Sequence, residues 1–561
     1  MFLKLVASLF GTAGVCTLYW ILSLLYKEIM SPWRYLRGPT STHWLYGNLK
    51  ELMDDAASGL EEHWQEQYGR THKIHRFFGQ TALHTTDTKA IHHFLSNTHI
   101  YQKSDGARFT LARIVGPGIL VVEGEVHKQQ RKIMNPAFGA PQVRELTEIF
   151  VDKSIKLRDI WAAQAAKSEG VARLEVLSWL SRATLDIIGL AGFNYKIDAL
   201  EAEEGAAPNE LAAAFQAAFA AATGFGFARI LQIQFPILRS IALTGDKMIL
   251  EAQATMMRIG RGLLADSKRE ISENGTFETG SGRARDLLTL LVRANTSKDL
   301  PVSQRLSDED VIAQVPTFLV AGHETTRYML NHCPFIPVED LSVLFSCVSS
   351  TAVTWALFAL TQNPTAQTRL REELLRVTAE RPTMDELNAL PYLDCVVRET
   401  LRVHAPVIST SRVALTDDVV PLSTPVTDIK GKVHESLRIR KGEEIMIPII
   451  ALNRDVEIWG PDAMEFRPER WDAPPPGASA IPGAWGHMLS FLGGPHGCIG
   501  FRFSLVEMKA LIFTLVRAFE FELAVPIAEM GKEVDIVQRP IVVTDRAAGN
   551  QLPLLVKAIS P

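Results

Sequence analysis

A cysteine near the C-terminus stands in a glycine-rich setting that suits it to bind a metal. Phe491, Gly494, Cys498 and Gly500 fit the pattern F-x-x-G-x-x-x-C-x-G, which this composition yields by chance only about once in a thousand such chains. Glycines leave backbone N–H groups free to point at the sulfur and let a flat cofactor approach closely. Residues 501–509 follow with a helical pattern, whose N-terminus favours negative charge on the sulfur. The sequence therefore predicts a thiolate ligand at position 498.

Four further motifs occur along the chain in a fixed order. They are His127-Lys-Gln-Gln-Arg131, Ala321-Gly-His-Glu-Thr-Thr326, Glu399-Thr-Leu-Arg402 and Phe466-Arg-Pro-Glu-Arg470-Trp471. Together with the Cys498 motif, they resemble the cytochrome P450 family of haem-thiolate monooxygenases, and specifically the fungal microsomal type. The resemblance implies a mainly α fold with small β-sheets, one N-terminal transmembrane helix, and haem b held through the Cys498 thiolate.

The resemblance also implies roles for individual residues. Glu324 and Thr325 would be catalytic, supplying an acid and a hydroxyl for proton delivery to bound oxygen. The haem site would include Phe491 and Cys498 together with four propionate donors: His127, Arg131, Arg412 and His496. The family commonly has Trp at the position of His127 and often Arg at that of His496. Propionate binding is therefore expected to be pH-sensitive in this chain.

An acidic residue and two arginines are expected to form a structural network. Glu399 and Arg402 are three residues apart and share one helical face. The family arranges this pair, together with Arg470, as a buried ion network behind the haem. Taken alone, the spacing suits an exposed salt bridge of about 0.3–0.5 kcal/mol equally well. With the cysteine motif present, we expect the network to serve folding and haem retention.

Composition narrows the possible functions. The chain has 58 Lys and Arg residues against 63 Asp and Glu, a net charge of -5, which excludes a globally basic nucleic-acid-binding protein. Apolar residues make up 47% of the chain, too many for disorder. Its five cysteines contain no CxxC pair, so neither a disulfide scaffold nor a zinc site of the usual spacing is expected.

The N-terminus predicts a membrane anchor. Residues 5–26 are an uncharged stretch of 22 residues, against the roughly 20 that a helix needs to span the hydrocarbon core. More basic residues follow it than precede it, which favours a cytosolic body. A cleaved signal peptide is the alternative, but its apolar core would be shorter. We expect an anchor at 1–27 in endoplasmic reticulum lipid, a linker at 28–50 and a catalytic domain at 51–561.

Helical patterns dominate from residue 141 to residue 269, and Ser272–Arg285 reads as a loop. Ser307 and Asp310 resemble a helix cap, and Pro316 is expected to bend the helix that follows. Strand-like runs cluster in the last third of the chain, at residues 419–422, 426–429, 444–450 and 541–543.

Residues 327–349 depart from the family pattern. The helix is expected to continue directly from the paired threonines into the small and apolar residues that resume at Ser350. The intervening 23 residues include Pro334 and Pro337, each costing about 3 kcal/mol or more inside a helix. Our hypothesis is a translated intron, since codons for Arg327 and Ser350 can contain splice signals in frame. A genuine loop insertion is the alternative.

The predicted reaction is insertion of one oxygen atom from O2 into a hydrophobic small molecule of terpenoid, steroid or fatty-acyl type, in secondary metabolism. Substrate contacts are expected in residues 105–118, 215–235 and 407–411. Electrons are expected from NADPH through NADPH-cytochrome P450 reductase. Candidate basic contacts for the reductase are Lys128, Lys132, Arg502 and Lys509. The alternatives are a haem-thiolate isomerase or dehydratase, or an inactive haem binder if the insert is real.

Overall fold

The computed structural model describes residues 25–54, 59–202, 209–223, 227–274, 286–296, 301, 305–322, 348–534 and 537–559, with scattered positions before residue 25. The chain forms two compact units. Unit 1 comprises Met1–Gln102 and Ser411–Pro448, and unit 2 comprises Lys103–Thr410 and Ile449–Pro561. The predicted anchor at residues 1–27 and the insert at 327–349 lie largely outside the described residues.

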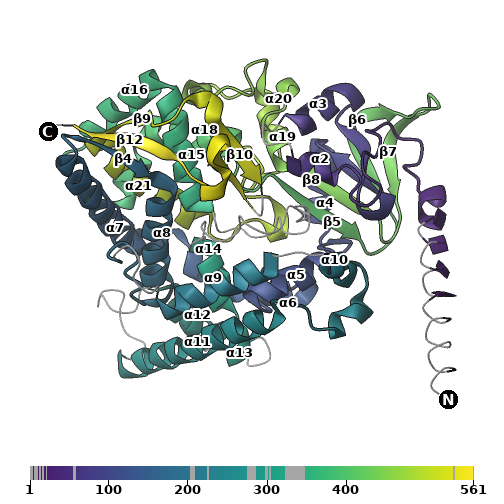
Figure 1. Ribbon diagram of the computed structural model, residues 1–561, viewed down its shortest axis with the longest axis horizontal. Helices are drawn as coiled ribbons and strands as arrows, with labels where there is room; N and C mark the ends of the chain where they lie inside the picture. Colours follow the sequence, from purple (N-terminus) through teal and green to yellow (C-terminus); the bar gives the residue numbers. More distant parts are fainter. Residues whose placement is uncertain are drawn as a thin grey trace. The chain divides into compact units, whose positions relative to one another are not determined.

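Unit 1 is built around small sheets (Figure 1). The larger sheet has the strand order β1 (Thr71–His75), β2 (Thr81–Thr85), β8 (Glu444–Pro448), β5 (Ser409–Ala414) and β3 (Tyr101–Gln102). A second sheet pairs β6 (Asp418–Thr427) with β7 (Val433–Ile439), and the helices are α2 (Leu49–Asp54), α3 (Leu60–Tyr68) and α4 (Thr88–Ser96). Trp64 of α3 packs on Ile74, Ala82 and Met446 to form a buried cluster.

The segment predicted as a linker packs into unit 1. Trp33, Leu36 and Leu49 are almost fully buried. The indole N–H of Trp33 donates to the backbone oxygen of Arg438 at 3.1 Å. Residues 33–49 are therefore part of the packed unit and do not form a free tether.

A buried aspartate joins α4 to the β6–β7 hairpin. Asp87 is fully buried and caps α4 by accepting from the backbone N–H groups of Lys89 and Ala90. The same carboxylate accepts from the backbone N–H groups of Ser423 and Thr424 at 2.8 and 3.0 Å. Ser423 and Thr424 lie at the register shift in β6. Asp87 therefore accepts hydrogen bonds from backbone N–H groups that are not paired between the strands.

Unit 2 is mainly helical. Its longer helices are α5 (Asp105–Val115), α6 (Gly124–Met134), α7 (Ala140–Lys167), α8 (Val176–Phe193), α9 (Glu210–Thr223), α10 (Phe227–Gln234), α11 (Asp246–Asn274), α12 (Leu287–Thr296), α14 (Gln314–Gly322), α15 (Val348–Gln362), α16 (Pro364–Leu375), α18 (Pro391–Val403) and α21 (Phe501–Ala518). The short ones are α13 (Asp308–Ile312), α17 (Met384–Asn388), α19 (Ile449–Asn453) and α20 (Val456–Trp459). Two sheets complete it: β4 (Val171–Glu175) with β12 (Pro553–Ala558) and β9 (Phe519–Leu523), and β10 (Met530–Val534) with β11 (Gln538–Val542).

The core of unit 2 gathers around α8 and α21. Helix α21 packs on α7 and α15, and α8 packs on α7, α14 and α15. Trp161 and Phe150 of α7 are fully buried, and the ring of Phe150 meets that of Phe503 edge-on at 4.7 Å. This packing fixes the start of α21, and Cys498 lies in the loop just before it.

Within the described part of the chain, one helix is long and apolar enough to span a membrane, α8. Unit 2 buries 78% of that segment, as is usual for a core helix. Length and composition alone are therefore weak evidence for a span.

The sequence predicted several elements correctly and missed others. The Ser307–Asp310 capping box is confirmed. Pro316, however, lies in the first turn of α14, after a break at Ala313, instead of bending one continuous helix. Strands β6, β8 and β11 fall on predicted runs, and strands β5 to β12 all lie in the last third of the chain, as expected. Strands β1 to β4 were missed. They lie near the start of the chain, and their polar composition hides the alternation that marks a strand.

Candidate haem-thiolate site

The loop that carries Cys498 is shaped by glycines. The backbone N–H of Cys498 donates to the oxygen of Phe491 at 2.9 Å, which closes the loop just before α21. A Cβ atom on Gly493 would stand 1.7 Å from the backbone oxygen of Pro482. Gly494 has a φ of 67°, a conformation that glycine adopts without strain. The glycines of the motif therefore permit the fold of the loop.

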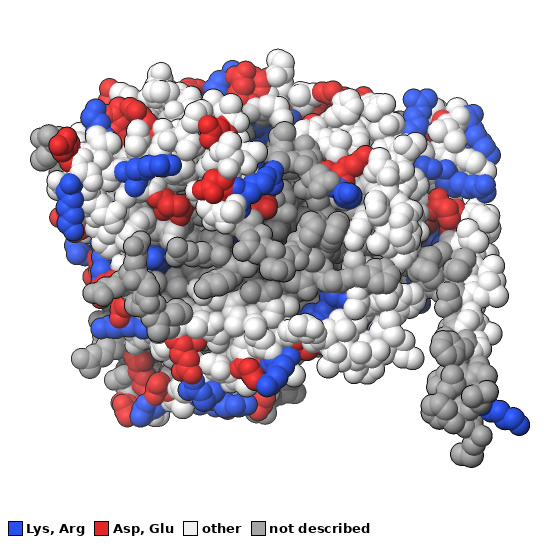
Figure 2. All heavy atoms as spheres, viewed as in Figure 1, with Lys and Arg blue, Asp and Glu red and all other residues white. Residues whose placement is uncertain are grey.

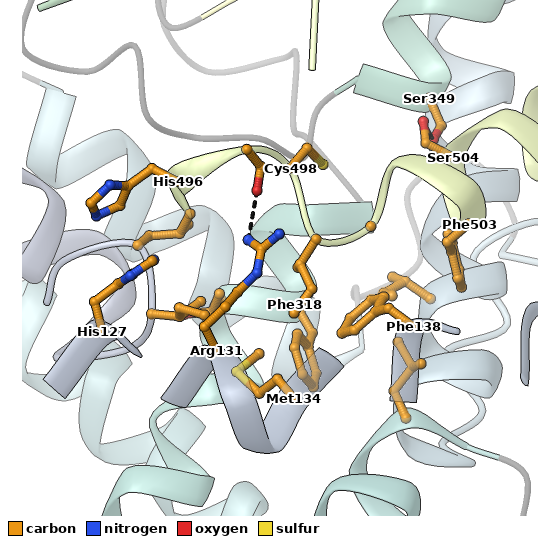
Figure 3. Close-up of a pocket in the computed structure, with 18 of the residues that line it drawn as sticks. His127, Arg131, Met134, Phe138, Phe318, Ser349, His496, Cys498, Phe503 and Ser504 are labelled. Atoms are coloured by element: carbon orange, nitrogen blue, oxygen red, sulfur yellow. Dashed lines mark hydrogen bonds between the residues drawn. The ribbon is translucent and has the colours of Figure 1, made fainter. Parts of the chain in front are cut away.

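Cys498 lines a cavity in unit 2 (Figure 3). The apolar part of the wall comes from Ile119, Leu120, Phe138, Ile188, Leu287 and Phe318. The basic part comes from Lys103, His127, Arg131 and His496. The cavity is thus apolar over most of its surface and positively charged along one side.

Arg131 fastens α6 to the cysteine loop. Its Nη1 atom donates to the backbone oxygen of Gly497 at 2.5 Å, and its Nε to the side chain of Asn135 at 3.0 Å (Figure 3). The imidazole rings of His127 and His496 lie 4.0 Å apart. Burial, with the nearby charges of His496 and Lys103, lowers the pKa of His127 to about 3, so this ring is neutral at physiological pH.

A carboxylate stands behind the basic side of the cavity. Glu123 contacts Lys103 Nζ at 2.7 Å and His496 Nε2 at 2.9 Å. Although burial raises the pKa of Glu123, the close contact with His496 and the charge of Lys103 more than offset it, and they hold this pKa well below the usual range. Glu123 is therefore ionised at physiological pH.

Burial favours the protonated form of the Cys498 thiol. Burial raises its pKa to about 11, although the backbone N–H of Gly500 and the charge of Arg131 act in the opposite direction. The N-terminus of α21 thus does not by itself ionise the sulfur. A metal ion deprotonates a coordinating thiol outright, so iron would supply the charge that stabilises the thiolate.

Hydroxyl groups form the end of the cavity near α15. The hydroxyls of Ser349 and Ser504 are hydrogen-bonded to each other at 2.8 Å, and both residues line the cavity (Figure 3). Glu507, one turn further along α21, is fully buried. Neither of its oxygens has a hydrogen bond of normal geometry to the described residues. Burial raises the pKa of Glu507 to about 8, against a smaller opposite effect of Ser349, so its acid is mostly neutral at pH 7.

The structure brings Glu399, Arg402 and Arg470 together as a buried cluster. Glu399 binds Arg402 through two contacts, at 2.7 and 2.9 Å, and Arg470 Nε at 3.3 Å. The indole N–H of Trp471 donates to the same carboxylate at 2.9 Å. Glu399 and Arg402 are 0% exposed, so the alternative of an exposed salt bridge does not apply.

The predicted haem-binding residues fall into two groups. Cys498, His127, Arg131 and His496 surround one cavity. Phe491 is not among its lining residues and contributes a backbone oxygen to the loop.

Three other predicted residues are not among the described residues that line this cavity. Arg412 belongs to unit 1, where it is buried and donates to the backbone oxygen of Ser411 at 2.6 Å. Glu324 and Thr325 lie outside the described residues.

Sequence reasoning missed Lys103, Glu123 and Phe318. Phe318 lies three residues before Ala321, so helical spacing from that motif could have indicated it. Lys103 and Glu123 belong to no motif, and only the fold brings them to His496.

The expected reductase contacts and the expected substrate contacts both need revision. Lys509 was predicted as an exposed reductase contact, but it is buried and contacts Asp394 at 2.8 Å; Lys128 is 77% exposed. On the face shown in Figure 2, acidic and basic side chains are interspersed over the described surface. Of the predicted substrate contacts, Leu111 and Ile114 are fully buried and are not among the lining residues of this cavity.

The residues present fit a haem. The cavity offers a sulfur ligand, apolar walls for a flat ring, and Lys103 and Arg131 on one side, where they suit carboxylates. Ligation through cysteine is the arrangement that favours O–O cleavage in haem proteins.

Comparisons with known proteins agree with this site. The cytochrome P450 family model matches residues 36–333 and 348–541. The chain is 49% identical to cytochrome P450 monooxygenase 205 of Postia placenta, over 98% of this chain and 97% of that protein. It is 46% identical to cytochrome P450 monooxygenase 128 of the same organism, over 97% of both, and 34% identical to cytochrome P450 monooxygenase claO of Ampulloclitocybe clavipes, over 96% of both. The chain therefore belongs to the cytochrome P450 family and is a P450 monooxygenase with a haem-thiolate centre.

Proposed function

We propose that this monooxygenase inserts one oxygen atom from O2 into a hydrophobic small molecule of terpenoid, steroid or fatty-acyl type, as a step in secondary metabolism. The observation that carries the proposal is the position of Cys498 in the wall of a mainly apolar cavity. Bound haem would supply the oxygen-activating chemistry. An apolar wall selects hydrophobic compounds and distinguishes among them only crudely.

The chain's own residues have separate tasks in this proposal. Arg131 and Lys103 would hold the acidic groups of the haem. Phe318 and Ile188 exclude water from the cavity, which strengthens the electrostatic interactions inside it. Glu324 and Thr325 would deliver protons to the bound oxygen, as the family resemblance implies.

The proposed location is the endoplasmic reticulum membrane, with one N-terminal span and the catalytic units in the cytosol. The uncharged stretch at residues 5–26 and the basic residues that follow it support this topology. Alkaline extraction of membranes tests it: the full chain should stay in the pellet, and a chain without residues 1–27 should be released. Release of the full chain would contradict the anchor.

We also propose that the active enzyme lacks residues 327–349. Pro334 and Pro337 fall in this segment, and residues 334–347 lie between the two stretches that the family model matches. Helix α14 ends at Gly322 and α15 begins at Val348, and the proposal makes them one helix. Sequencing the transcript tests this: mature messages that all retain these codons would refute it. In that case an inactive haem binder becomes the better description.

The reaction is tested by co-expressing the chain, with and without residues 327–349, with an NADPH-dependent flavoprotein reductase. After reduction, carbon monoxide should produce the red-shifted Soret band of a thiolate-ligated haem. Incubation under ¹⁸O2 with terpenoid, steroid and fatty-acid panels should then give products with one heavy oxygen atom, dependent on NADPH. A product without ¹⁸O, formed without the reductase, would refute the proposal and favour an isomerase or dehydratase.

A further inference from the structure

Glu123 occupies the N-cap position of α6 but does not cap it. Acidic residues at this position normally accept from the first free N–H groups of their own helix. Here the side chain makes no such hydrogen bond. Its carboxylate is turned to two residues far away in the chain, so the contacts of Glu123 serve something other than the helix end.

The partners of Glu123 both face the cavity. Its Oε1 accepts from Lys103 twice, from Nζ at 2.7 Å and from the backbone N–H at 3.2 Å. Its Oε2 stands 2.9 Å from Nε2 of His496. The three side chains are between 2% and 7% exposed. Lys103 and His496 line the cavity, whereas Glu123 does not.

This arrangement joins three segments of unit 2 at one carboxylate. They are the chain before α5, the start of α6 and the loop two residues before Cys498. His127 and Arg131, on the same helix α6, line the cavity next to them. The positive charges of Lys103 and Arg131 line the same wall, and like charges near one another are unfavourable unless an opposite charge stands among them. Glu123 supplies that negative charge from a position outside the cavity wall, in contact with Lys103 and His496.

We propose that Glu123 is a positioning residue for the haem of the proposed enzyme: it holds Lys103 and His496 against the cavity wall, where they receive the acidic groups of the cofactor. The inference rests on the proposed haem-dependent function. Lys103 becomes a further cofactor-binding residue. Glu123 itself touches no cofactor and acts through its two partners.

The test measures how fast haem leaves the full chain, in whichever form, with or without residues 327–349, shows the red-shifted Soret band. Glu123→Gln keeps the size of the side chain and removes its charge. Transfer of haem to excess apomyoglobin, followed by absorbance, should be about tenfold faster or more in this variant, equivalent to 1.4 kcal/mol or more. Glu125→Gln is the matched control, since Glu125 lies two residues away, is 89% exposed and forms an exposed ion pair with Lys128 at 3.6 Å. Its rate should equal that of the parent.

Lys103→Met tests the same cluster from the other side. This variant should also speed haem loss. In the double variant with Glu123→Gln, the fold increase in the haem-transfer rate should not exceed the product of the two single-variant increases. A merely structural role would lower the unfolding midpoint of the haem-free chain and leave the rate of haem transfer unchanged. That result, or equal rates in Glu123→Gln and Glu125→Gln, would overturn the inference while the parent keeps its Soret band. If neither parent form shows that band, the proposed function fails and this inference with it. If Glu123→Gln does not accumulate as folded protein, Lys103→Met decides, and an unchanged rate overturns the inference.

Discussion

Glu399→Gln should destabilise unit 2 far more than the loss of an ordinary ion pair. The variant keeps the size of the side chain and removes the charge that Arg402 and Arg470 face. Arg402 retains hydrogen bonds to the backbone oxygens of Asn453 and Ala463 at 3.0 and 2.6 Å. These oxygens carry no net charge, so they cannot replace the carboxylate.

The expected loss of unfolding free energy follows from the burial of the three side chains. Glu399 and Arg402 are 0% exposed, and the side chain of Arg470 is 2% exposed. Removing one partner from a buried ion pair costs about 3–5 kcal/mol, because the remaining charge has no water to solvate it. Asp385→Asn breaks a comparable contact, Arg144 to Asp385 at 2.8 Å, between side chains that are 51% and 70% exposed. That variant should lose only about 0–1 kcal/mol.

Urea unfolding followed by far-ultraviolet circular dichroism separates the two cases. With a slope near 3 kcal/mol per M, about 3–5 kcal/mol corresponds to a shift of the midpoint by roughly 1 M or more. Haem content after purification should fall in Glu399→Gln and not in Asp385→Asn. The reasoning is refuted if the two variants shift the midpoint by the same amount, or if Glu399→Gln moves it by less than about 0.3 M.

Three further outcomes are expected. Cys498→Ser should remove the red-shifted Soret band of the reduced carbon monoxide complex; a band that persists would exclude Cys498 as the iron ligand. Asp87→Asn should cost about 1–3 kcal/mol in urea unfolding, because the α4 cap and the Ser423 N–H lose a charged acceptor; no shift would contradict that role. Since Glu507 keeps in the folded state a proton that the unfolded chain releases, stability should fall as pH rises from about 4.5 to 8. Glu507→Gln should flatten this dependence, and equal slopes in both proteins would show that Glu507 is not its source.

The parts of the site that spacing alone predicted have partners that lie close together in the chain, whereas the links to His127, Arg131 and Arg470 came from the family resemblance. Phe491 and Cys498 are joined by one backbone hydrogen bond within a short loop. Glu399 and Arg402 share a helical face. Such short spacings fix geometry before any tertiary contact forms, so pattern reasoning reaches them.

Contacts between distant segments escaped the same reasoning. Glu123 meets His496 only because α6 and the cysteine loop pack together, and neither motif contains the other residue. Lys509 has the charge of a surface residue, yet tertiary contact with Asp394 buries it. Residue type sets a preference for exposure, and a partner brought by the fold can reverse it.

The hydrogen bond between Ser349 and Ser504 relates the cavity to the segment 327–349, because Ser349 is the last residue of that segment. Ser349 binds the hydroxyl of Ser504 at 2.8 Å and immediately precedes Ser350 in α15. Without residues 327–349, Thr326 would precede Ser350 in the chain, so a hydroxyl-bearing residue would again stand next to it. Removal of the segment would therefore keep a hydroxyl group next to Ser350 and take away two prolines, a residue type that helix interiors disfavour. Under the proposed removal, the shorter chain would supply both the hydroxyl next to Ser350 and a helical sequence without prolines between Ala321 and Ser350.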